Sequence, residues 1–198
     1  MDNRYTIIRT EEERRQKGIP KLQMDQILWE PDCGIRAEAR IHHDGRSLFI
    51  ALAAREKNIR AEYISPGSPV YEDSCMEFFF MPEGEDSYMN FEINPNGCLY
   101  VGFGRERNGR KLIIPADPQD LFRIWTKRSA DGWEAGFRIP MMFLRQYYPD
   151  FDFKGTLKAN VYKCGDKTEH PHYLAWNRVE APAPDFHRPE CFGEMIFG

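Results

Sequence analysis

The chain has 198 residues, of which 41% are hydrophobic and 29% charged, so a disordered chain is excluded and one domain with a buried core is expected. Its 31 acidic and 27 basic residues give a net charge of −4 and are spread along the sequence, which argues against binding to nucleic acid. The longest apolar run, residues 48–54, is far shorter than the roughly 20 residues of a membrane span.

We expect a single domain over residues 1–198, in which residues 1–30 form an N-terminal arm and the first strands. The beginning of the chain has no apolar segment followed by a small-residue cleavage site, so the sequence predicts no export signal. The five cysteines are odd in number and lack a Cys-x-x-Cys spacing, which argues against a disulfide framework and against a cysteine zinc site. We therefore expect reduced, mostly buried thiols.

The first confident strand is predicted at residues 35–41, where isoleucine and alanine alternate with arginine and glutamate. Asp44-Gly45 marks a turn, and the apolar segment 47–55 returns as the second strand of a hairpin. Residues 60–73 contain two prolines and a glycine that a central strand would not accept, so this segment is expected to form a loop.

Alternation and turn signals predict further short strands along the rest of the chain. They are expected at residues 74–81, 88–94, 98–103, 122–128, 133–139, 156–164 and 191–197. Helix is scarce, and the best candidate begins at Pro140, because proline is tolerated in the first turn of a helix. The pattern predicts an all-β fold, an antiparallel β-sandwich with one or two short helices.

Three segments taken together resemble carbohydrate-binding module family 9. The first is VYEDSCMEFFFMPEGEDSYMNFEINPNGCLY at 70–100, in which an aromatic residue, an acidic pair and a strand glutamate precede a strand that ends in Asn-Pro-x-Gly. The second is the WEAGFRIP strand that begins at Trp133, with the later LKANVYK strand. The third is the tail HYLAWNRVEAPAPDFHRPECFGEMIF at 172–197. The resemblance extends from about residue 27 to the C-terminus.

This resemblance implies an immunoglobulin-like β-sandwich whose slot between aromatic side chains holds the end of a glycan chain without catalysing a reaction. It also implies a link to polysaccharide catabolism, with oligosaccharide or polysaccharide ends and a glycoside hydrolase as partners, although the chain contains no recognisable hydrolase domain. Family members are usually secreted or periplasmic and hold structural calcium. Carboxylates that could bind calcium are Glu72, Asp73, Glu83, Glu85 and Asp86.

Matched position by position, the resemblance implies that Tyr71 and Trp176 are the aromatic plates and that Glu77 is the glutamate of the site. A pyranose has a flat C–H face that an aromatic ring can cover, and a contact of about 60 Å² contributes ~1.5 kcal/mol. An ionised Glu77 would accept hydrogen bonds from two neighbouring hydroxyls. Amides both donate and accept as hydroxyls do, which makes secondary candidates of Asn94, Asn160 and Asn177.

Each of these residues also has a structural interpretation. Glu77 could be a surface carboxylate paired with a cation, and Tyr71 could pack on its loop. A lone tryptophan in a β protein usually belongs to the core, which is the position we expect for Trp29, Trp125 and Trp133. For the tail residues 186–189, packing at the sandwich edge is favoured over a ligand role.

Three other functions remain open on the sequence. A small glycoside hydrolase would need two carboxylates, which Glu77 and Glu92 on adjacent strands could supply. A haem-binding electron-transfer sandwich would use methionine and histidine ligands, and a protein-interaction sandwich would use Tyr71 and Trp176 as a hot spot. The short histidine groups at 42–43 and 170–172 lack zinc-site spacing, so metal ligands are not assigned.

Overall fold

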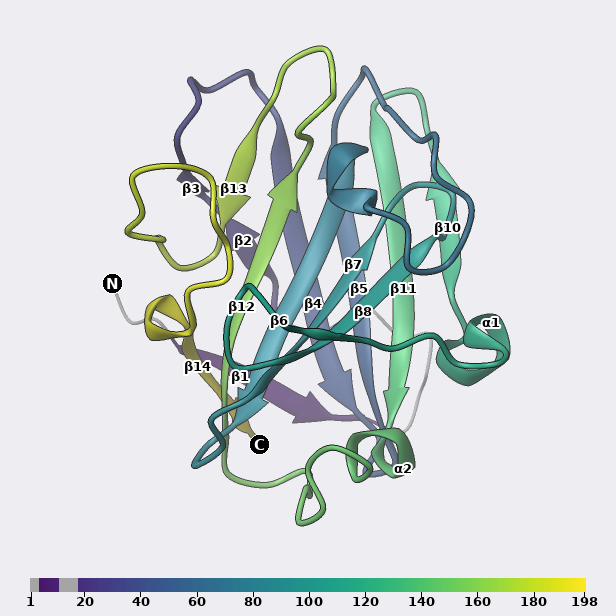
Figure 1. Cartoon of the computed structure of the whole chain (residues 1–198), viewed down its shortest axis with the longest axis vertical. Coiled ribbons are helices and arrows are strands. Elements are labelled where there is room, and N and C mark those ends of the chain that lie inside the picture. The colour runs from purple at the N-terminus through teal and green to yellow at the C-terminus, as the bar shows by residue number, and fades with distance from the viewer. Residues whose placement is uncertain (1–3, 11–17) are drawn as a thin grey trace.

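The computed structural model of the chain describes residues 4–10 and 18–198 (Figure 1). Its strands are β1 (Arg4–Arg9), β2 (Leu22–Met24), β3 (Gln26–Ile27), β4 (Arg36–His43), β5 (Ser47–Arg55), β6 (Cys75–Pro82), β7 (Tyr88–Ile93), β8 (Leu99–Gly104), β9 (Lys111–Leu112), β10 (Trp125–Arg128), β11 (Gly132–Pro140), β12 (Thr156–Cys164), β13 (Tyr173–Ala175) and β14 (Gly193–Phe197). Two short α-helices, α1 (Pro118–Phe122) and α2 (Met141–Leu144), and two 3-10 turns, η1 (Val70–Glu72) and η2 (Pro189–Cys191), complete the regular structure.

The strands form one curled sheet whose two halves face each other as a sandwich. We call β14-β12-β6-β7-β8-β9, with β13 and β3, the front sheet, and β10-β11-β5-β4, with β2, the back sheet. Strand β1 joins the two halves, because its first residues pair with β14 and its last residues pair with β4, in both cases in parallel. All other pairings are antiparallel within the described residues. The predicted β-sandwich is therefore confirmed, with β1 as a parallel exception.

The main core lies between the two sheets and follows from the alternation of side chains along each strand. In β6, Met76, Phe78 and Phe80 face this core. The alternate residues of β6 point to the outer face of the front sheet, where Phe79 belongs to a second hydrophobic cluster. This outer face is also buried, because the tail after β13 folds over it: Tyr162 of β12 stacks on Phe186 of the tail with ring centroids 4.0 Å apart.

Most predicted elements match the structure within a few residues. The predicted strand 122–128 is wrong at its beginning, because α1 ends at Phe122 and β10 begins only at Trp125. Asp117 caps α1 by accepting a hydrogen bond from the Asp120 amide at 2.9 Å. Arg123 then adopts a left-handed conformation, with φ 46°, which ends the helix. Among the described residues, no helix is long and apolar enough to cross a membrane.

Candidate functional site

A slot of about 430 Å³ opens on the outer face of the front sheet. It lies where the turn η1, the connection after β8 and the C-terminal tail approach the ends of β6, β7 and β12. Its volume falls in the range typical of small-molecule sites. The aromatic residues that line it are Trp29, Tyr71, Tyr100, Tyr173 and Phe186.

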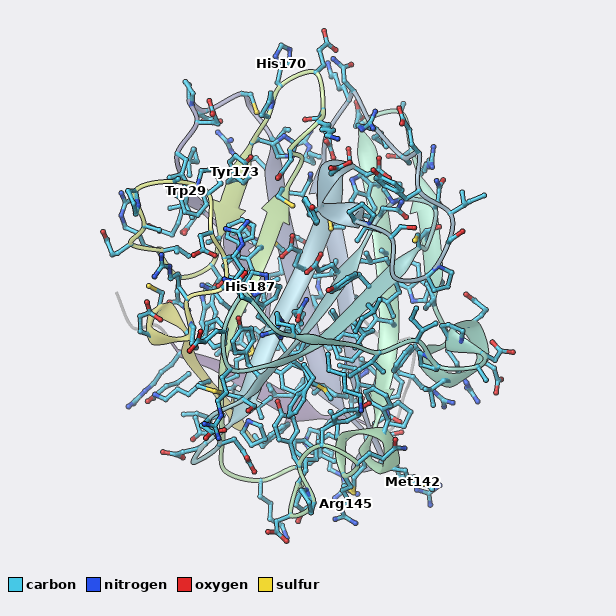
Figure 2. The ribbon with its side chains drawn as sticks, in the orientation of Figure 1. Trp29, Met142, Arg145, His170, Tyr173 and His187 are labelled. Carbon is cyan, nitrogen blue, oxygen red and sulfur yellow. The ribbon has the colours of Figure 1, made fainter. Side chains whose placement is uncertain are left out.

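One aromatic wall of the slot is built around Trp29. Its ring packs against Tyr173 in an edge-on arrangement at 5.4 Å and against Phe186 at 5.6 Å. Its indole nitrogen donates a hydrogen bond to the Ala181 carbonyl at 2.8 Å, which ties the segment before β4 to the C-terminal tail. Figure 2 shows Trp29 and Tyr173 side by side, with His187 on the same side of the molecule. Trp29 is thus held rigidly from three directions.

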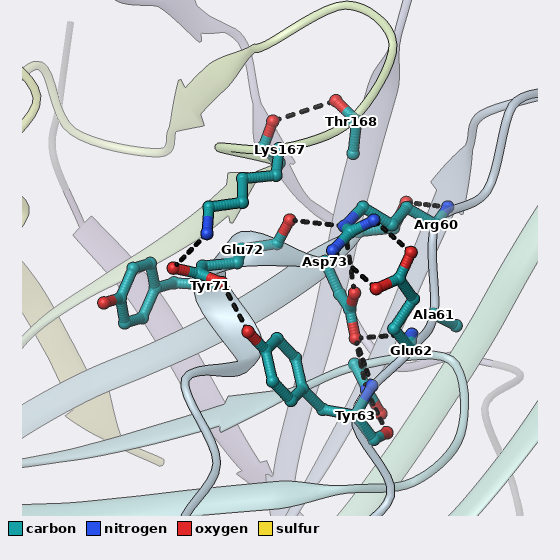
Figure 3. Close-up of polar contacts among 12 residues, drawn as sticks. Arg60, Ala61, Glu62, Tyr63, Tyr71, Glu72, Asp73, Lys167 and Thr168 are labelled. Carbon is teal, nitrogen blue, oxygen red and sulfur yellow. Dashed lines mark hydrogen bonds and ion pairs between the residues drawn. The ribbon is translucent and has the colours of Figure 1, made fainter.

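Tyr71 supplies the most exposed aromatic surface of the slot, since 43% of the residue is accessible. It lies in the turn η1, which polar contacts hold in place (Figure 3). The neighbouring Glu72 accepts hydrogen bonds from the Tyr63 hydroxyl and from Lys167 Nζ, the latter at 2.9 Å. The carbonyl of Tyr71 itself accepts from the Asp166 amide at 3.2 Å. The backbone of Tyr71 is therefore fixed, while its ring stays open to a ligand.

The carboxylates at this turn do not fit a calcium site. Asp73 Oδ2 accepts hydrogen bonds from the amides of Glu62 and Tyr63, and the Arg60 guanidinium lies 3.4 Å from Asp73 Oδ1. Glu72 is paired with Lys167, as described above. Calcium prefers six to eight oxygen ligands, whereas two cationic side chains already occupy the space beside these carboxylates. Calcium elsewhere on the chain stays a prediction.

Two carboxyl groups form the floor of the slot. Glu77 of β6 and Glu92 of β7 are directly opposite each other in the antiparallel pair, and both are buried. Glu92 Oε1 accepts a hydrogen bond from Asn90 Nδ2 at 2.7 Å, whereas its Oε2 has no hydrogen-bond partner among the described residues. This oxygen is therefore a buried acceptor left without a partner in the floor of the slot.

Burial changes the protonation of both groups. It raises the pKa of Glu77 well above its ordinary value, and the neighbouring Glu92 raises it further. Burial also raises the pKa of Glu92, to about 7, although the Asn90 hydrogen bond and Arg110 act in the opposite direction. Burial therefore favours the protonated form of Glu77, whereas the sequence analysis expected an ionised glutamate. The floor offers both a hydrogen-bond donor and acceptors.

Two buried thiols lie beside this floor. The ligand atoms of Cys75, Glu77 and Cys164 lie within 4.8 Å of one another, and this is the one group of described residues with a geometry suitable for a metal ion. Burial raises the pKa of the Cys75 thiol to about 12 and also raises that of Cys164. Cys164 Sγ donates a hydrogen bond to Glu77 Oε1 at 3.0 Å. Burial thus favours the protonated forms of all three groups, whereas a metal ion would bind their deprotonated forms.

Arginines and a neutral histidine surround the carboxyl floor. Arg110 lies over the Tyr88 ring at 4.0 Å and donates two hydrogen bonds to Asn90 Oδ1. His187 Nδ1 lies 2.8 Å from the Tyr88 hydroxyl, and burial lowers the pKa of its imidazole to about 4. The imidazole is thus uncharged at neutral pH. Arg107 also lines the slot and lies 3.6 Å from Asp185.

The structure brings together only two of the six residues that the sequence suggested. Tyr71 and Glu77 line the same slot. Trp176 does not line this slot and is partly buried against the main core, so the wall around Trp29 is the second aromatic surface here, and a sugar contact by Trp176 stays a prediction. The expected core position of Trp125 is wrong, because this residue is 41% exposed, whereas Trp133 is buried as predicted. Trp29 is partly buried against the second hydrophobic cluster and also lines the slot.

The three asparagine candidates lie outside the slot. Asn94 is buried, and its amide donates to Asp73 Oδ2 and accepts from the Cys98 amide, so it stabilises a turn. Asn160 donates to the Asn177 carbonyl at 2.9 Å and accepts from the Asn177 amide at 3.0 Å. The side chain of Asn177 is buried, with no hydrogen-bond partner among the described residues. The side chains of Asn94 and Asn160 thus hold neighbouring backbone in place, and a sugar contact by any of the three amides stays a prediction.

Sequence reasoning missed Trp29 and His187 as residues of the slot, and it paired Glu92 with Glu77 only in the hydrolase alternative. Two features of the sequence could have indicated these residues. Trp29 stands before the turn-forming sequence Glu-Pro-Asp-Cys-Gly, outside any alternating strand pattern. Phe186 and His187 follow a proline-rich segment that is too irregular for a strand. Aromatic residues in such loops are better candidates for a binding surface than those within strands.

The raised pKa of Glu92 predicts that part of the stability is lost as the pH rises. The folded chain keeps a proton up to about pH 7 that the unfolded chain releases near its ordinary value of 4.5. The free energy of unfolding of the wild type should therefore fall relative to that of Glu92→Gln, by about 2 to 3 kcal/mol between pH 5 and pH 8. Buried histidines such as His172, with a pKa lowered to about 4, act in the opposite direction below pH 6.5.

Urea unfolding of both chains at several pH values would measure this difference, because the histidine contributions cancel when the two chains are subtracted. A difference that stays constant from pH 5 to pH 8 would show that Glu92 is ionised throughout.

Comparisons with known proteins place the chain among sugar-binding domains. The family model of carbohydrate-binding family 9 matches residues 10–197. A crystal structure from Bacteroides uniformis, described provisionally as a carbohydrate-binding protein, is 27% identical, with a TM-score of 0.85 over 98% of this chain and 99% of that chain. No curated protein matches the chain.

Two further structures show the same fold at lower identity. Both are family 9 carbohydrate-binding modules from Caldicellulosiruptor kristjanssonii with 12% identity, one in complex with cellotriose and one with glucose. The cellotriose complex has a TM-score of 0.65 and the glucose complex 0.66; each match covers 98% of this chain, and 93% and 95% of the respective modules.

Proposed function

Because the chain belongs to carbohydrate-binding family 9, we propose that its slot holds the end of a neutral glycan chain without cleaving it. The observation that carries this proposal is the combination of an exposed tyrosine ring with a buried, partly protonated carboxyl pair in one slot. Carbohydrate binding is the function of the family, and the placement of the sugar in this slot is our inference.

The chemistry of the slot suits a pyranose ring. Tyr71 can cover the apolar C–H face of the ring, and the wall around Trp29 limits its position. The hydroxyls of a sugar both donate and accept hydrogen bonds, and the floor contains Glu77, whose burial favours the protonated form, together with the unpartnered Oε2 of Glu92. A buried oxygen without a partner costs about 1 to 3 kcal/mol, which a ligand hydroxyl would recover.

Calorimetric titration with glucose, cellobiose, cellotriose and other neutral oligosaccharides tests this function. We expect millimolar to micromolar dissociation constants, because the loss of translational and rotational freedom offsets much of the gain from one or two ring contacts. Affinity should increase little beyond the disaccharide, since a slot of about 430 Å³ holds a chain end and not a long chain. The absence of saturable binding to every neutral oligosaccharide would contradict the proposal.

We expect Trp176→Ala to lower stability without changing glycan affinity. The indole packs on the main core, so its removal should reduce the free energy of unfolding by about 2 to 3 kcal/mol. Trp176→Phe should retain most of the stability and all of the binding. Thermal unfolding and calorimetry on the same samples would measure both. A folded Trp176→Ala chain with tenfold weaker binding would restore Trp176 as a sugar contact.

The paired carboxyls of Glu77 and Glu92 also have the residue types of a hydrolase pair. We propose that they bind and do not cleave, in keeping with the family. No reducing sugar should be released from the bound oligosaccharides. A release that Glu77→Gln abolishes would instead identify an enzyme. A partnership with a glycoside hydrolase in polysaccharide breakdown is part of the same proposal.

A further inference from the structure

A second cavity, of about 740 Å³, lies on the outer face of the back sheet, away from the slot. It is lined by residues of β4, β5, β10 and β11 and by the helix α1. We propose that this cavity is a second saccharide site, in which a neutral pyranose stacks on the indole of Trp125. This inference goes beyond the proposed function of the slot, because it concerns a different sheet and different residues.

The indole of Trp125 is presented as a plate on the sheet surface. Trp125 lies in the edge strand β10 directly opposite Gly136 of β11. A Cβ atom at position 136 would lie 2.5 Å from indole atoms Cε2 and Nε1, so the close approach of the ring to the sheet requires glycine there. The residue nevertheless remains 41% exposed. A large aromatic surface is therefore fixed in position and left open at the cavity.

A buried histidine in the same cavity lacks hydrogen-bond partners. His42 is only 5% exposed and stacks on Phe49 at 4.8 Å with an interplanar angle of 12°. Neither of its ring nitrogens has a hydrogen-bond partner in the part of the chain that the structure describes. Burial lowers the pKa of His42, so the ring is neutral and has one donor and one acceptor. A hydroxyl group can satisfy either nitrogen.

The charges around the cavity favour a neutral ligand. The lining residues include two carboxylates, Asp117 and Asp120, and two guanidinium groups, Arg123 and Arg138. Asp117 caps α1, and Arg138 Nε donates to the Leu121 carbonyl at 3.3 Å. The formal charges of these four described residues balance, so they favour neither a phosphate nor an ammonium group. An aromatic plate beside balanced polar groups suits a neutral sugar ring.

Nuclear magnetic resonance of the full chain can test the second site directly. The four tryptophans give four indole N–H signals, and that of Trp125 is assigned by its loss in Trp125→Ala. The probes are cellotriose, xylotriose, mannotriose and laminaritriose, titrated into the wild type, Tyr71→Ala and Trp125→Ala. We expect at least one trisaccharide to shift the Trp125 signal in the wild type, and the same shift to persist in Tyr71→Ala, where the slot is impaired.

Trp125→Ala should weaken binding at this site at least tenfold and leave binding at the slot unchanged. Trp125→Phe has a smaller aromatic ring and should show an intermediate loss of affinity. It keeps the test valid if the alanine variant does not fold. Met142→Ala is the control, because this side chain is 84% exposed and lines neither cavity. If none of the four trisaccharides shifts the Trp125 signal, or if Trp125→Ala binds with unchanged stoichiometry and affinity, the second site does not exist.

Discussion

Glu56→Ala should lower the free energy of unfolding by about 3 to 5 kcal/mol, the largest loss of stability that we expect from one substitution. Glu56 follows β5 and is buried together with Lys163 of β12, whose Nζ lies 3.2 Å from Glu56 Oε2. The same carboxylate accepts hydrogen bonds from Ser74 Oγ at 2.7 Å and from Trp133 Nε1 at 2.9 Å. It thus joins residues of both sheets.

The size of the effect follows from what the substitution leaves behind. Lys163 is fully buried, and its remaining contacts are with His172 Nε2 at 2.6 Å and the Cys164 carbonyl at 2.7 Å. Without Glu56, its charge would have no counterion among the described residues, which costs more than the loss of a hydrogen bond. The strand β12 also carries Cys164 at the slot floor, so its position there depends on this network.

Urea unfolding of Glu56→Ala and Glu56→Gln would measure the loss. The glutamine variant should be less affected, because its single amide oxygen can still accept from one of the two donors, Ser74 Oγ or Trp133 Nε1. Glu134→Ala, an exposed carboxylate of β11, is the matched control and should change stability by less than about 0.5 kcal/mol. A loss below about 1 kcal/mol in Glu56→Ala would mean that the buried lysine does not depend on this carboxylate.

Tyr71→Ala should weaken glycan binding about tenfold or more. The expected ring contact of about 60 Å² corresponds to ~1.5 kcal/mol, and 1.4 kcal/mol is a factor of ten in affinity. Stability should be nearly unchanged, because the contacts that hold η1 come from the backbone and from Glu72. Tyr71→Trp, with a larger ring, should bind more tightly.

Calorimetry with the tightest-binding oligosaccharide would measure the three dissociation constants. Ile64→Ala is the matched control, since Ile64 lies in the same loop, is 79% exposed and does not line the slot. An equal affinity of Tyr71→Ala and the wild type would remove Tyr71 from the site.

The sequence predicted those features that depend on neighbours along the chain. Alternation located β6 and placed Glu77 on the face of this strand that points away from Phe78 and Phe80, and the structure has the same arrangement. The alternation of β12 places Lys163 on the core-facing side of that strand, which the sequence analysis did not use. This lysine follows Leu157, Ala159 and Val161 on the core-facing side of β12, and a charge in that position requires a buried partner.

The features that the sequence could not predict depend on long-range contacts. Trp29 is held at the slot by a hydrogen bond from its indole nitrogen to the carbonyl of Ala181, which is 152 residues away in the sequence. Burial raises the pKa of Glu77 because the tail covers the outer face of the front sheet, and no local pattern shows that covering. Trp176 matched a motif, but the path of the backbone after β13 directs it to the main core. The motif therefore indicated strand β6 with Glu77, but it did not indicate the aromatic wall around Trp29.

The most direct test of the slot is a crystal structure of the chain with the oligosaccharide that binds most tightly. The account predicts a terminal pyranose inside the slot, with its C–H face on the Tyr71 ring and a hydroxyl within hydrogen-bond distance of Glu77 or of Glu92 Oε2. A saccharide bound elsewhere at full occupancy, with the slot filled only by water, would contradict it.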